Sequence, residues 1–129
     1  MISVRVAAPA EFEAARKFIC SLFPDAMVQV EDCDTVLLAE HDGKPIGFLH
    51  LIEEEDRFLL QGIGVVESMR SRGVGTLLME RALDLLRHNP KPVYLKVKAL
   101  NPAVDLYARY GFAMKKFGER HVLVKMVDA

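Results

Sequence analysis

Arg70-Ser71-Arg72-Gly73-Val74-Gly75-Thr76 joins an apolar, strand-like run to a strong helical pattern. The run before it, residues 58–66, is typical of a buried strand, and apolar side chains recur at helical spacing over residues 75–87. The turn is therefore predicted at the start of a helix. There, unpaired backbone N–H groups and the positive end of the helix dipole favour a bound phosphate.

The residue types of this turn suit an anion. Gly73 and Gly75 lack side chains that would hold a diphosphate away from the backbone amides, and Arg70 and Arg72 add mobile positive charge. Two other phosphate-binding motifs fit less well. A P-loop needs Gly-Lys-Ser/Thr, which is absent, and the Gly-x-Gly at 62–64 is followed by a glutamate where a dinucleotide fingerprint has its third glycine.

Two motifs resemble the signatures of one family. Arg70-x-x-Gly73-x-Gly75, after a strand ending in Val65, resembles the acetyl-CoA signature of the GNAT superfamily of N-acetyltransferases, Arg/Gln-x-x-Gly-x-Gly/Ala. Leu106-Tyr107-Ala108-Arg109-Tyr110-Gly111-Phe112 resembles that family's second signature, Leu-Tyr-x-x-x-Gly-Phe. The two stand in the family's order and at about its spacing, so together they are more specific than either alone.

The composition favours one small domain. With 129 residues, of which 51% are hydrophobic, the chain is long enough for one core, so we expect a single domain over residues 1–129. A net charge of -1 argues against nucleic acid or an anionic membrane as a partner. Neither a membrane span nor a signal peptide is predicted, so we expect a cytoplasmic protein. Two isolated cysteines argue against a disulfide framework or a metal site, and a homodimer is left open.

Periodicity along the chain predicts an α/β (α+β) fold with a mixed, mostly antiparallel sheet of six to seven strands flanked by helices, as the resemblance to the GNAT fold also implies. The expected strands are 2–7, 35–40, 46–52, 58–66, 93–97, 112–114 and 121–126, and the expected helices are 9–23, 75–87 and 102–110. An Asp-Gly pair at 42–43 predicts a hairpin turn. Residues 25–34 fit either a short helix or a strand-like crossing.

The resemblance implies roles toward acetyl-CoA for several residues. The pantetheine arm is expected to pair with the backbone of Ile63, Gly64 and Val65, while residues 70–76 hold the diphosphate. Gly62 and Gly64 fit either a close approach of this ligand or a locally bulged strand. A backbone N–H near Val65 is expected to stabilise the oxyanion that forms when an amine attacks the thioester.

Tyr107 matches the family tyrosine that faces the sulfur of CoA in many members. A phenol with a pKa of about 10 can protonate the departing thiolate, so Tyr107 is the predicted general acid; the alternative is a tyrosine that only packs in the core. Asn101 corresponds to an asparagine common in the family, but it precedes Tyr107 by six residues instead of seven. It is either a residue of the CoA site or only a helix cap.

The group that accepts the amine proton is left open among Glu67, His50, the glutamates at 53–55 and a water relay. Lys96 stands where the ribosomal-protein N-terminal acetyltransferases use a glutamate base, and a different gap puts Leu95 there. Because an ammonium would repel a cationic amine, the sequence predicts acetyl transfer to a small-molecule primary amine in a ternary complex. The alternatives are a protein N-terminal or lysine acetyltransferase and an acyl-CoA sensor without turnover.

Overall fold

Seven strands form one sheet in the order β1-β2-β3-β4-β5-β7-β6 in the computed structural model, which describes residues 1–98, 107–116 and 120–125. The strands are β1 (Ile2–Val6), β2 (Thr35–His41), β3 (Lys44–Glu53), β4 (Phe58–Val65), β5 (Val93–Lys98), β6 (Ala113–Lys116) and β7 (Arg120–Lys125). Neighbouring strands are antiparallel except β4 and β5, which are parallel. The predicted mixed, mostly antiparallel sheet is therefore confirmed.

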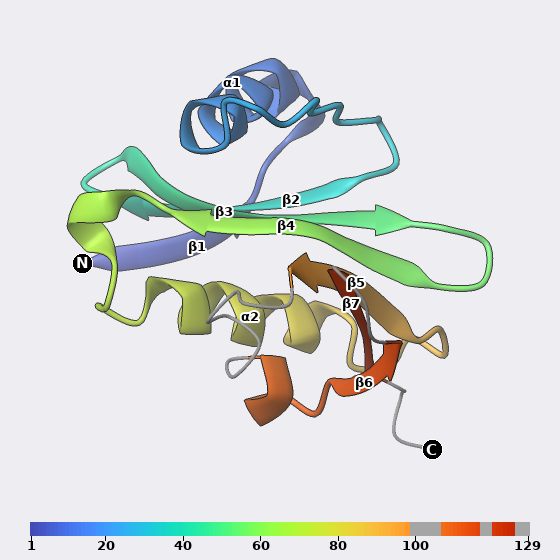
Figure 1. Cartoon of the computed structure of the whole chain (residues 1–129). Coiled ribbons are helices and arrows are strands. Elements are labelled where there is room, and N and C mark those ends of the chain that lie inside the picture. The colour runs from blue at the N-terminus through green and yellow to red at the C-terminus, as the bar shows by residue number, and fades with distance from the viewer. Residues whose placement is uncertain (99–106, 117–119, 126–129) are drawn as a thin grey trace.

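Two helices cover opposite faces of this sheet, with α1 (Phe12–Leu22) above it and α2 (Val74–Leu85) below it in Figure 1. Short 3-10 turns, η1 (Pro9–Glu11) and η2 (Glu67–Met69), lead into each helix. The cluster on the α1 face consists of Ala7, Ala15, Ile19, Val36, Leu38 and Phe48. A larger cluster on the α2 face joins α2 to β2, β3, β4 and β5. The sheet thus separates two apolar cores.

The local signals of the N-terminal half are confirmed. Asp42 and Gly43 have φ angles of 53° and 78°, and they join β2 to β3 as the predicted hairpin. Strand β4 pairs antiparallel with β3 and completes a meander. Residues 25–34, for which helix and strand were both open, form neither. Within the described residues, no helix has the length and apolar character needed to cross a bilayer.

Helix α2 buries one side against the sheet. Its buried residues are Val74, Leu78, Met79 and Ala82, whereas Leu85 is 52% exposed. A helix that packs on one face of a sheet buries one side, so the outer side of α2 faces solvent.

The helix predicted over 102–110 lies largely outside the described residues. Residues 107–109 are helical, and Gly111 follows them with a φ of 88°. The N–H groups of Gly111 and Phe112 donate to the carbonyls of Ala108 and Tyr107. This left-handed glycine ends the helix as the sequence predicts.

Arg5 ties the start of the helical layer to the sheet. Its guanidinium donates to both carboxylate oxygens of Glu11, at 2.7 and 2.5 Å, and its Nε donates to Glu40 Oε1 at 2.7 Å. The hydrogen bonds from Arg5 are the main cause that lowers the pKa of Glu11 from 4.5 to about 2. Strand β1 and η1 are thereby joined through charge-assisted bonds.

We expect a Glu11→Gln variant to be less stable than the natural chain at neutral pH. Ionised Glu11 stabilises the fold fully above pH 4.5, and this contribution disappears as the pH falls through about 2, because the folded-state pKa is depressed. The difference between the two proteins should therefore shrink as the pH falls. Urea unfolding at several pH values measures it, with exposed Glu55→Gln as the control; a difference independent of pH would contradict the linkage.

Candidate functional site

The turn before α2 has the backbone of an open anion site. Ser71 and Gly73 have positive φ angles of 64° and 80°, and both residues are exposed. The first helical hydrogen bond in α2 runs from Leu77 N–H to the Gly73 carbonyl, and no side chain caps the helix. The N–H groups of residues 74–76 therefore have no partner within the helix and are free to meet an anion.

The two arginines of the turn lie differently. Arg70 Nε donates to the carbonyl of Val65 at 3.1 Å, so its guanidinium turns back to the end of β4. Arg72 is exposed. The turn and the end of β4 are thus in direct contact, as a ligand spanning both would require.

Among the described residues, strand β4 has an edge without a partner strand next to this turn. Its described ladder with β5 runs from Phe58↔Val93 to Leu60↔Leu95 and then stops, although β4 continues to Val65. Figure 1 shows the two strands diverging beyond this point. In the part of the chain that the structure describes, no strand pairs with β4 on that side beyond Leu60, so its backbone groups there are available to an extended ligand.

The alternation of an antiparallel pair decides which groups face that edge. Val66 N–H donates to the Ile46 carbonyl of β3, so Val66 and, two residues earlier, Gly64 direct their backbone groups toward β3. Ile63 and Val65 direct theirs the other way. Of the three residues predicted to pair with pantetheine, Ile63 and Val65 face the open edge, whereas the backbone of Gly64 faces β3.

The packing around Gly64 leaves no room for a side chain. A Cβ added there would lie 2.8 Å from ring atoms of both Phe23 and Phe48, which cover the α1 face of β4. The two rings meet edge to face with centroids 5.9 Å apart. Gly62 lies beside the register shift between β3 and β4, so the bulge was one correct alternative for it. Phe23, which the sequence placed merely at a helix end, thus contacts the candidate site.

We expect Gly64→Ala to destabilise the protein by about 1–3 kcal/mol, because the new methyl group must displace an aromatic ring. The matched control is Gly62→Ala on the same strand, where the nearest ring atom lies 3.4 Å from the added Cβ, an ordinary contact. Denaturant unfolding of both variants measures the difference. Equal stabilities would show that the rings move aside without cost.

Tyr107 lies in the core on the α2 face. It is 6% exposed and packs edge to face on Phe112, with ring centroids 6.0 Å apart. Burial raises the pKa of Tyr107 above its usual value, so the phenol keeps its proton at neutral pH. The ring thus packs as the core alternative predicted, while its protonated hydroxyl meets the chemical requirement for a general acid.

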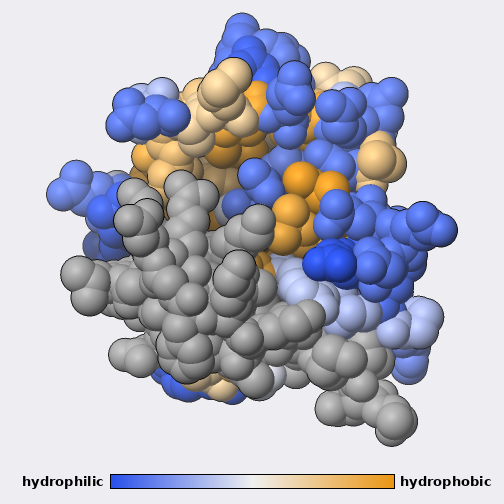
Figure 2. Space-filling model, turned by 45° about the vertical axis from the view of Figure 1, so that its right-hand side comes forward, coloured by the Kyte–Doolittle hydropathy of each residue, from blue (hydrophilic) through white to orange (hydrophobic). Residues whose placement is uncertain are grey.

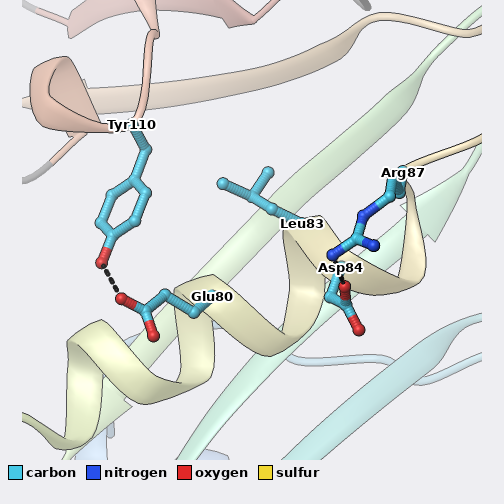
Figure 3. A pocket seen from close by; sticks show the side chains of 5 residues that line it. All are labelled: Glu80, Leu83, Asp84, Arg87 and Tyr110. Atoms are coloured by element: carbon cyan, nitrogen blue, oxygen red, sulfur yellow. Dashed lines mark hydrogen bonds and ion pairs between the residues drawn. The ribbon is translucent and has the colours of Figure 1, made fainter.

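The neighbouring Tyr110 faces another part of the surface. Its hydroxyl donates to Glu80 Oε1 at 3.3 Å across a pocket of about 440 Å³ (Figure 3). Leu83 and the ion pair of Asp84 with Arg87 complete the lining on the outer side of α2. The Tyr110 side chain also interacts with the side chain of Thr76, so the pocket begins next to the anion turn and extends along α2 from there.

The candidate proton acceptors differ in their surroundings. His50 is 2% exposed, and its Nε2 lies 2.8 Å from Asp34 Oδ2, so it is structural in this state. Glu67 is exposed, and Glu53 pairs with Lys91 at 2.9 Å. Asn101 and the side chain of Lys96 lie outside the described residues. Sequence reasoning missed Asp34, because an acidic run gives no sign that one carboxylate is buried.

Among the described residues, no group of His, Cys, Asp and Glu side chains is arranged to hold a metal ion. The described residues instead offer a positive helix start beside an open edge of β4, and Tyr107 supplies a protonated phenol on the α2 face of the same sheet. A helix start and a strand edge of this kind can bind an extended, phosphate-bearing ligand through backbone groups.

The chain matches the acetyltransferase (GNAT) family over residues 7–112 and belongs to it. A similar curated protein, the N-alpha-acetyltransferase of Sulfolobus acidocaldarius, is 40% identical over 53 residues, which is 39% of this chain and 32% of that protein. The match therefore spans about a third of that relative's length.

Two solved structures illustrate the shared fold. The ribosomal-protein-S18-alanine N-acetyltransferase of Escherichia coli is 18% identical, with a TM-score of 0.79 over 100% of this chain and 96% of that one. Arabidopsis thaliana NAA60, solved in complex with acetyl-CoA, is 21% identical, with a TM-score of 0.74 over 100% of both chains. The GNAT fold predicted from the two signatures is confirmed.

Proposed function

We propose that the protein is an acetyl-CoA-dependent N-acetyltransferase whose residues 1–129 act as one domain. The observation that carries the proposal is the contact of Arg70, in the turn that leads into α2, with the Val65 carbonyl at the open edge of β4. A diphosphate on the first and an extended pantetheine arm along the second match the two ends of CoA. Family membership and a fold shared with an acetyl-CoA complex support this assignment.

In this proposal the N–H groups of residues 74–76 bind the diphosphate, and exposed Arg72 adds positive charge. The backbone of Ile63 and Val65 pairs with the pantetheine arm. Arg70 must then release the Val65 carbonyl that it now contacts, since the ligand would use the same edge. The cofactor-binding roles of Gly73 and Gly75 are to keep this surface free of side chains.

The chemistry is an attack of the amine nitrogen on the thioester carbonyl carbon. The Val65 N–H stabilises the oxyanion of the tetrahedral intermediate. When the carbon–sulfur bond breaks, the electron pair goes to sulfur, and Tyr107 gives its phenolic proton to the thiolate. The amine proton leaves through water or a nearby base, and Tyr107 is reprotonated from solvent. Tyr107 is the catalytic residue of this scheme.

We propose a small-molecule primary amine as the acceptor, because Lys96 or Leu95 stands where a protein N-terminal acetyltransferase has its glutamate base. A protein N-terminus is the second candidate, and a specific observation favours it: the similar curated proteins of Sulfolobus acidocaldarius and Sulfurisphaera tokodaii are N-alpha-acetyltransferases.

The test combines binding with turnover. CoA and acetyl-CoA are titrated into the purified protein, and release of free thiol is then followed over amino acids, polyamines, other small amines and N-terminal peptides. Thiol release with small amines above peptides supports the proposal, whereas a clear preference for peptides selects the second candidate. Binding of acetyl-CoA without thiol release on the whole panel would indicate a sensor instead.

A further inference from the structure

We propose that Asp34 and His50 form a positioning pair that holds the acceptor side of the site in place. The pair anchors residues 23–34 over β4 and so controls binding of the amine, not of acetyl-CoA. This inference rests on the proposed function, which places the acetyl group beside β4.

The pair is buried, and both of its side chains are hydrogen-bonded. The side chains of His50 and Asp34 are 2% and 1% exposed, and His50 Nε2 donates to Asp34 Oδ2 at 2.8 Å. The same carboxylate oxygen accepts the Glu31 N–H at 3.0 Å, while the Asp34 N–H donates to the Glu31 carbonyl at 2.9 Å. A buried carboxylate persists where such donors replace water, so Asp34 ties its loop to strand β3.

His50 lies on the same strand and the same face of the sheet as Phe48, whose ring covers part of β4. His50 follows Phe48 by two residues on β3, so their side chains share a face, and the cross-strand partners of these residues are Gly62 and Gly64. The Phe48 ring extends over both glycines. His50 therefore holds the loop beside the ring that covers the reacting part of β4.

The anchored segment begins with the second of these rings. Phe23 packs on Gly64, and Val28 and Val30 pack against the core on the α1 face. Met27, which directly precedes Val28, is 99% exposed. Figure 2 shows apolar residues gathered in the upper half of the surface, the half in which α1 and this segment lie. The segment is thus fixed at Gly64 by Phe23 and at β3 by Asp34, with Val28 and Val30 packed on the α1 face between these two points.

In the proposed function the diphosphate binds at the start of α2, on the α2 side of the sheet, and the pantetheine arm runs along the edge of β4. The α1 side of β4, where this segment packs, is then left for the acceptor amine. A shift of the segment would weaken its contacts with the bound amine while leaving the phosphate turn intact. Loss of contacts that act equally on the bound substrate and on the transition state raises KM.

The test is Asp34→Ala, which removes the acceptor of both hydrogen bonds. We expect it to raise KM for the best amine of the panel about tenfold, with KM for acetyl-CoA and its affinity within about twofold of the natural chain. Asp56→Ala, an exposed aspartate in the loop between β3 and β4 and outside this segment, is the control and should behave like the natural chain. Asp34→Asn, which keeps the size and one accepting oxygen, should fall in between and decides the question if Asp34→Ala does not fold.

Hydrogen exchange gives a readout that does not depend on activity. Asp34→Ala or Asp34→Asn should speed exchange over residues 24–33 and leave residues 77–82 of α2 unchanged. If the natural chain acetylates no amine, the proposed function fails, and faster exchange would still establish that the pair holds the segment. Unchanged exchange, an unchanged amine KM, or an equal loss of acetyl-CoA affinity would overturn the positioning role.

Discussion

Replacing Gly73 by aspartate is expected to weaken CoA binding by about a hundredfold, or ~2.7 kcal/mol, while the domain stays folded. Gly73 precedes the first turn of α2, and a Cβ there meets no other atom within 4 Å, so the new side chain fits. Its carboxylate repels a diphosphate at the free N–H groups of the turn. Isothermal titration with CoA measures the loss.

Two controls separate charge from backbone strain. Gly73→Asn carries the same cost of a φ of 80° without the charge, so it should lose much less affinity. Gly43→Asp places the same side chain at a φ of 78° in the β2–β3 hairpin, where it should leave CoA binding unchanged. Full CoA affinity in Gly73→Asp would remove the turn from the proposed site.

Tyr107→Phe is expected to lower kcat about a hundredfold with acetyl-CoA affinity within about twofold, because the hydroxyl acts on the departing thiolate in the transition state. The Tyr107 ring packs on Phe112, and phenylalanine keeps that contact. The thermal midpoint should therefore change little. Steady-state thiol release and a thermal melt of the same preparation measure both quantities.

Tyr94→Phe is the matched control, since the Tyr94 ring lies 4.3 Å from Arg57, beside the start of β4 and at the opposite end of that strand from Val65. This variant should keep the kcat of the natural chain. If Tyr107→Phe loses stability in proportion to its rate, or if the two variants lose equal rate, Tyr107 acts in packing and another group protonates the sulfur.

Local sequence determined most of the elements. The Asp-Gly pair at 42–43 specified the hairpin because both residues tolerate positive φ, and periodicity specified the strands and helices around it. The turn at 70–76 was predicted at a helix start and is found there. Helix α2 begins at Val74, one residue earlier than expected. Such features depend on neighbours in the chain, so residue types and spacing are sufficient to predict them.

Only the tertiary structure decided how these elements make a site. The ladder of β4 with β5 stops at Leu60, Phe23 reaches Gly64 from the end of α1, and Asp34 meets His50 in the core. Each of these depends on residues far apart in the sequence. Because close packing and buried hydrogen bonds act through space, the pattern of one segment does not reveal which distant side chain completes it.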